Sequence, residues 1–63
     1  MDEAQKKEAA EYAATCKIEH LKSLIDSLRW RLDHGHFQSP AELDMAKDCL
    51  KIYERIHNER TAI

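Results

Sequence analysis

Cysteine and histidine are the residues of this chain best suited to hold a metal ion. Cys16 and His20 lie four positions apart, which places both side chains on one face of a helix at ligand spacing. In an antiparallel hairpin His57 falls at roughly the same level. Cys16 and His20, however, occupy heptad positions f and c, which face away from a partner helix, and no Cys-x-x-Cys pair accompanies them. The sequence therefore predicts exposed side chains, no metal site and no cofactor, with a Cys/His/His site as the minor alternative.

The remaining reactive side chains do not form a catalytic pattern. The chain has no Gly-rich phosphate loop and no Ser/His/Asp nucleophile set, and its carboxylates recur as ordinary helix-surface charge. Cys16 and Cys49 lie roughly nine residues apart along the hairpin, beyond disulfide reach at about 1.5 Å per residue. His34 and His36 flank Gly35, where capping and solvation are favoured over a pH-sensitive contact. We expect a non-enzymatic protein.

Arg29, Trp30 and Arg31 form the candidate partner surface. Trp30 occupies heptad position f, off the apolar seam, between two arginines. Tryptophan and arginine are the residue types most enriched in binding hot spots. Two interpretations stay open: burial of Trp30 against a second copy of the chain, beside Leu24 or Phe37, and an exposed anchor for a different protein.

A basic stripe follows the second half of the chain. Lys47, Lys51 and Arg55 recur every four residues and could meet phosphates. Acidic residues interleave with them at ion-pair spacings: Asp44, Asp48 and Glu54. A solvated helix face is therefore the default, and a nucleic-acid-associated regulator is the alternative function.

The single glycine and the single proline place the only predicted turn. Gly35 can close a helix in the left-handed conformation, and Pro40 suits the first position of the next helix. Ser39 is the predicted N-cap, with Glu42 completing a capping box. These signals predict an all-α antiparallel hairpin, with a helix over about 3–34, a turn at 35–39 and a helix over about 40–60.

Apolar periodicity predicts how the two helices pack. In the first helix apolar residues alternate steps of four and three: Ala14, Ile18, Leu21, Ile25, Leu28 and Leu32. The second helix carries two apolar rows, a face wider than one partner helix covers. The predicted core, shared between two copies, comprises Ile18, Leu21, Ile25, Leu28, Leu50, Tyr53 and Ile56. Residues 1–12 extend past the hairpin, either frayed or reaching a partner chain. We therefore expect a homodimer with a four-helix assembly.

Length and composition agree with a single small domain spanning residues 1–63. A chain of 63 residues buries only about 60% of its unfolded surface, so its stability is marginal without help such as oligomerisation. The net charge of −2, with 35% charged residues, lowers the expectation of a nucleic-acid or membrane role. The polar N-terminal residues lack the apolar stretch of a secretory signal. These features favour a cytoplasmic protein with no membrane partner.

With these residues laid out, the chain resembles a small early accessory protein of lambda-type temperate bacteriophages. Such proteins are encoded between the recombination exonuclease and the excisionase. The resemblance rests on chain length and on two segments: Asp2-Glu3-Ala4-Gln5-Lys6-Lys7-Glu8 and Leu28-Arg29-Trp30-Arg31-Leu32-Asp33-His34-Gly35-His36-Phe37. It implies a protein of the bacterial host cytoplasm that biases host physiology or the lysis-lysogeny decision by contacting a host or phage protein. It implies no catalytic residues.

Overall fold

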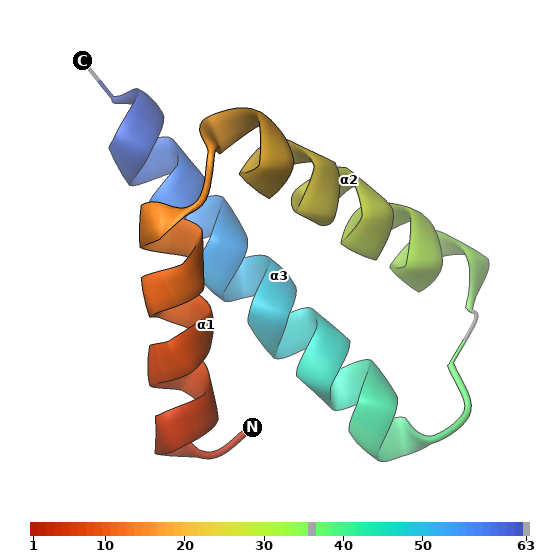
Figure 1. Cartoon of the computed structure of the whole chain (residues 1–63). Coiled ribbons are helices and arrows are strands. Elements are labelled where there is room, and N and C mark those ends of the chain that lie inside the picture. The colour runs from red at the N-terminus through yellow and green to blue at the C-terminus, as the bar shows by residue number, and fades with distance from the viewer. Residues whose placement is uncertain (36, 63) are drawn as a thin grey trace.

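Three helices make up the part of the chain that the structure, a computed structural model, describes, namely residues 1–35 and 37–62. They are α1 (Glu3–Thr15), α2 (Ile18–His34) and α3 (Pro40–Thr61). Both α1 and α2 lie against α3, which is the longest helix and the one the others share (Figure 1). The all-α prediction is confirmed, and no strand occurs among the described residues. The predicted role of His36 lies outside the described residues.

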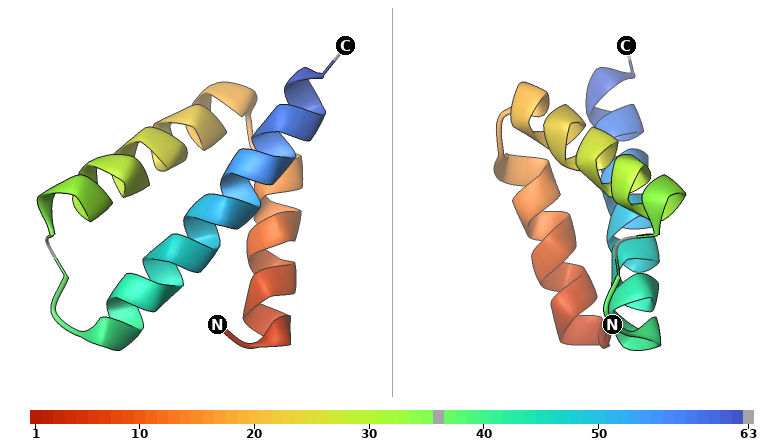
Figure 2. Two further views of the ribbon diagram at one scale, coloured as in Figure 1. Left: turned by 180° about the vertical axis from the view of Figure 1, so that it is seen from behind. Right: turned by 90° about the vertical axis from the view of Figure 1, so that its right-hand side faces the viewer.

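The expected single helix over residues 3–34 is wrong, because the chain breaks at Cys16 and Lys17. Both residues have extended backbone, with ψ angles of 166° and 140°. Neither glycine nor proline lies nearby, and Lys17 provides no side-chain cap for α2. Local sequence therefore does not signal the break. Tertiary packing accounts for it, since the break allows α1 to turn back onto α3 (Figure 2).

The expectation that residues 1–12 lack an intrachain partner is also corrected, because α1 packs on α3 of its own chain. The small side chains of Ala9 and Ala13 are buried, which lets the two helices approach closely. Arg60 Nη1 donates to the Ala13 carbonyl at 2.7 Å. At the other end of α1, the Met1 amino group lies 3.3 Å from the Asp48 carboxylate. Part of the α3 surface that we expected a second copy to cover is thus covered by α1 of the same chain.

The core lies where all three helices meet. Leu21 is the largest fully buried side chain, at 0% exposure, and it clusters with Ala13, Ile25 and Ile56. Three other residues of the predicted core pack against this cluster while partly exposed: Ile18, Leu50 and Tyr53. Leu28 is half-buried. Figures 1 and 2 show that α2 and α3 run in opposite directions and diverge toward the turn.

The turn between α2 and α3 follows its local sequence. Gly35 has a φ of 67°, and its N–H donates to the Arg31 carbonyl at 2.9 Å. Ser39 Oγ accepts from the Glu42 N–H at 3.2 Å, which confirms the predicted N-cap. The reciprocal bond differs from a capping box, because Glu42 Oε2 accepts from the Gln38 N–H at 3.2 Å instead of from Ser39. The Glu42 side chain therefore binds the backbone N–H of Gln38, one residue before the expected Ser39.

A complete capping box occurs instead at α1. Asp2 Oδ1 accepts from the Gln5 N–H at 2.8 Å, and Gln5 Oε1 accepts from the Asp2 N–H at 3.2 Å. Two N–H groups that a helix start leaves unpaired are thus satisfied. Within the described residues, no helix combines the length and the apolar character needed to cross a membrane.

Candidate protein-interaction surface at the end of α2

Trp30 is the most exposed large apolar side chain of the described residues, with 53% of its surface accessible. It lies on α2 five positions after Ile25. The Ile25 side chain is buried in the core, and a step of five residues places Trp30 on a different face of the helix. The Trp30 surface comprises Arg29, Trp30, Arg31 and His34. Within this chain the structure places Trp30 outside the core, as its position off the apolar seam predicts.

The indole ring of Trp30 stacks on the imidazole ring of His34. The two rings stack with their centroids 4.1 Å apart and their planes inclined by 18°. His34 Nδ1 lies 2.8 Å from the Trp30 carbonyl oxygen, and because a carbonyl only accepts, Nδ1 carries the hydrogen. Sequence reasoning named both residues but missed this contact, although the i, i+4 spacing signals it. An ordered ring pair loses less side-chain entropy when a partner covers it.

The two arginines extend from the helix to either side and pair with α3. Arg29 Nη2 lies 2.9 Å from Glu54 Oε2, and Arg31 Nη2 lies 3.1 Å from Glu42 Oε1. The Arg31 guanidinium also sits 5.1 Å from the centre of the half-buried Phe37 ring, a cation–π distance. Because all four charged side chains of these ion pairs are exposed, each pair contributes at most about 1 kcal/mol. Either arginine can therefore exchange its carboxylate for one on a partner protein.

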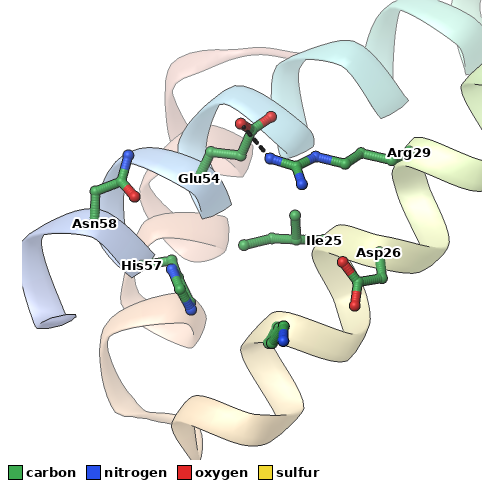
Figure 3. Close-up of a pocket in the computed structure, with 7 residues that line it drawn as sticks. Ile25, Asp26, Arg29, Glu54, His57 and Asn58 are labelled. Atoms are coloured by element: carbon green, nitrogen blue, oxygen red, sulfur yellow. Dashed lines mark hydrogen bonds and ion pairs between the residues drawn. The ribbon is translucent and has the colours of Figure 1, made fainter.

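A cavity of about 200 Å³ lies beside the Arg29–Glu54 pair, between α2 and α3 (Figure 3). Its lining mixes both signs of charge around one apolar side chain: Lys22, Ile25, Asp26, Arg29, Glu54, His57 and Asn58. The ion pair between Arg29 and Glu54, drawn as a dashed line in Figure 3, spans part of the cavity. The cavity therefore lacks a dominant charge that would select a ligand.

The side chains considered for a metal site have other neighbours. Tyr12 Oη and His20 Nε2 lie 2.7 Å apart, across the break between α1 and α2. Cys16 Sγ donates to the Ala13 carbonyl at 3.8 Å, within the α1 end. Among residues 1–35 and 37–62, no three His, Cys, Asp or Glu side chains lie close enough to bind an ion together.

Cys49 lies half-buried where the start of the chain meets α3. Its Sγ is 3.7 Å from Met1 Sδ, and the Met1 side chain is only 6% exposed. Burial raises the pKa of the Cys49 thiol, and the Asp48 carboxylate adds to the rise. Burial also raises the pKa of the Tyr53 phenol, with Cys49 as the next contributor. Both groups are therefore neutral at physiological pH, and Cys49 is a packing residue instead of a reactive thiol.

The basic stripe on α3 is exposed at all three positions, Lys47, Lys51 and Arg55. Two of the three acidic residues expected to neutralise it have different partners. Asp48 pairs with the Met1 amino group, and Glu54 pairs with Arg29. Within the described residues Lys47 and Lys51 form no ion pair, while Arg55 lies 4.0 Å from Glu59. The stripe is therefore less neutralised than the spacing predicts.

Comparisons with protein-family models, with curated proteins and with solved structures find no match to this chain. The class of protein is therefore defined by the geometry alone. It is an all-α protein with a small three-helix core and an exposed Trp–His stack flanked by arginines.

Proposed function

We propose that this chain is a non-enzymatic accessory protein that acts by binding another protein through the Trp30 surface. The observation that carries the proposal is the 53% exposure of Trp30. A tryptophan ordered by stacking and flanked by two arginines combines the features of an interface hot spot. The resemblance to early proteins of lambda-type phages supplies the biological setting. In that setting the partner is a host or phage protein in the bacterial cytoplasm, and binding biases host physiology or the lysis-lysogeny decision.

Self-association is part of the same proposal. Only six apolar side chains of the described residues are buried: Ala9, Ala13, Leu21, Ile25, Ala46 and Ile56. Leucines on both α2 and α3 remain half-exposed, among them Leu28 and Leu43. A core of this size supports a homodimer, in which a four-helix assembly of two hairpins covers more apolar surface.

Trp30→Ala is expected to weaken partner binding about 30-fold or more, which corresponds to the roughly 2 kcal/mol of a hot-spot tryptophan. The tagged chain is used to capture proteins from bacterial lysate, and captured proteins are identified and titrated in pure form. Met45→Ala is the matched control, because Met45 is an exposed apolar residue, at 42%, on a different helix.

A protein retained by the wild type and by Met45→Ala, but lost with Trp30→Ala, supports the proposal. Equal retention by Trp30→Ala contradicts it. Circular dichroism and sedimentation of the Trp30→Ala chain check that the fold and the oligomeric state are unchanged. Because Trp30 is the only tryptophan, its fluorescence reports whether the purified partner covers it.

The second candidate function is nucleic-acid association through Lys47, Lys51 and Arg55. The observation that favours it is the diversion of Asp48 and Glu54 to other partners. Replacing Lys47 and Lys51 by glutamine is expected to reduce DNA or RNA retention at low salt, and retention by the wild type should fall steeply as salt rises. Absence of wild-type retention at low salt, measured by gel shift, excludes this function.

A further inference from the structure

We infer that α1 is an exchangeable segment: the break at Cys16–Lys17 straightens into a continuous helix, and α1 then packs on α3 of a second copy of this chain. The surface involved is the face of α3 that α1 covers in the single chain. This inference rests on the self-association proposed above and is independent of the Trp30 surface.

The residues of the break specify it weakly by themselves, and the side-chain contact that spans it joins Tyr12 Oη and His20 Nε2 at 2.7 Å. Cys16 and Lys17 are extended without a glycine, a proline or a side-chain cap to hold them so. In a continuous helix the Lys17 N–H would donate to the Ala13 carbonyl, four residues earlier. In the folded-back chain that carbonyl accepts from Arg60 and from the Cys16 thiol, and the Lys17 N–H has no acceptor among the described residues. Straightening therefore gives the Lys17 N–H a backbone acceptor, the Ala13 carbonyl.

The interface between α1 and α3 does not depend on which chain supplies α1. Its contacts are the buried Ala9 and Ala13, the Arg60 bond to the Ala13 carbonyl and the Met1–Asp48 ion pair. The alanine packing and the Met1–Asp48 ion pair can form in the same way between two copies, which is the condition for exchanging a segment. The Ala13 carbonyl has two lone pairs, so it can accept from Arg60 of the second copy as well as from the Lys17 N–H of its own helix. A chain opened alone would lose these contacts, because α1 would extend away from its own α3. A second copy is the occupant that matches this surface residue for residue.

The directions of α1, α2 and α3 are compatible with two-fold symmetry between the two copies. Met1 lies beside Asp48 and Ala13 beside Arg60, so α1 runs in the same sense as α3. After straightening, α1 continues the axis of α2, which runs opposite to its own α3 (Figure 2). The straightened α1 is then parallel to α3 of a second copy, provided that a two-fold axis relates the two copies and passes near the C-terminal ends of their α3 helices.

The residue order fits the same arrangement. Ala13, close to the break, would meet Arg60 near the dimer centre, and Met1 would meet Asp48 farther out. Two straightened helices of about 48 Å, at 1.5 Å per residue, together with two α3 helices make a four-helix assembly.

Lys17→Pro tests the exchange directly. Lys17 has a φ of −63°, and its N–H donates to no acceptor in the described part of the chain. Cys16 is extended, as a residue before proline prefers. Proline therefore fits the folded-back chain. In a continuous helix it lowers the equilibrium constant for helix formation in each chain by about 100-fold. We expect the dimer dissociation constant of Lys17→Pro, measured by sedimentation equilibrium, to rise by at least about 100-fold. Lys17→Ala is the matched control, because it removes the same charge and is expected to dimerise at least as tightly as the wild type.

The location of α1 is read in the wild-type chain by isotope-filtered NOEs in a mixture of labelled and unlabelled protein. Contacts between Ala13 and Arg60 are expected between chains. A dimer whose Ala13–Arg60 contacts are all within one chain overturns the exchange but leaves self-association intact. A wild-type monomer from micromolar to millimolar concentration overturns both. A Lys17→Pro dimer as tight as the wild type also overturns the exchange.

Discussion

Leu21→Ala is expected to lower the free energy of unfolding by about 3 kcal/mol, the cost of removing a fully buried leucine and leaving a cavity. Leu21 is 0% exposed and lies in the cluster formed with Ala13, Ile25 and Ile56, so the cavity would open at the junction of all three helices. A domain of 63 residues has roughly 3–9 kcal/mol of stability in total. Urea denaturation followed by circular dichroism should therefore show a chain close to unfolding.

Leu24→Ala is the control for this substitution. Leu24 is on the same helix and only half-buried, so the same atoms are removed with a loss of about 1 kcal/mol. Equal losses for Leu21→Ala and Leu24→Ala would contradict the position of the core. The comparison should be made at one protein concentration, because association adds to the apparent stability.

Ala13→Arg is expected to detach α1 from α3 and to cost about 2–3 kcal/mol. Ala13 is 0% exposed, so a long side chain has no room there. It would also bring a second positive charge beside Arg60, whose guanidinium contacts the Ala13 carbonyl. Hydrogen exchange should show the α1 amides losing protection while those of α2 and α3 near Leu21 keep theirs.

Ala14→Arg provides the matched control, because Ala14 is the next residue on the same helix and is exposed. It should leave both the protection of α1 and the urea midpoint unchanged. If Ala13→Arg were equally silent, residues 3–15 would not pack on α3. That result would restore the frayed or partner-reaching segment expected from the sequence.

The turn between α2 and α3 shows how far local sequence reaches. Gly35, Ser39 and Pro40 each have one conformational role that they perform well, and the structure places all three in it. The buried positions of α2 were also predictable, since Leu21 and Ile25 stand on the heptad seam. These features depend on interactions within four residues or on a helical period, both of which can be read from a sequence.

The surroundings of Trp30 could be predicted only in part. Its position off the seam indicated exposure within the chain, and the structure gives it 53%. Glu54 and Glu42, which hold the neighbouring arginines, lie 25 and 11 residues away in the chain. Their identity depends on how α2 and α3 diverge, and helix periodicity does not specify that angle.

The sequence by itself determined the helical composition, the turn at Gly35–Pro40 and the side of α2 that is buried, because each follows from short-range conformational preference and periodicity. Only the tertiary structure decided the break at Cys16–Lys17 and the return of α1 onto α3. Residues 15–18 contain no glycine, proline or side-chain cap that would signal a bend. The choice between a helix and a bend is therefore made by distant contacts, above all those of Ala13 and Arg60.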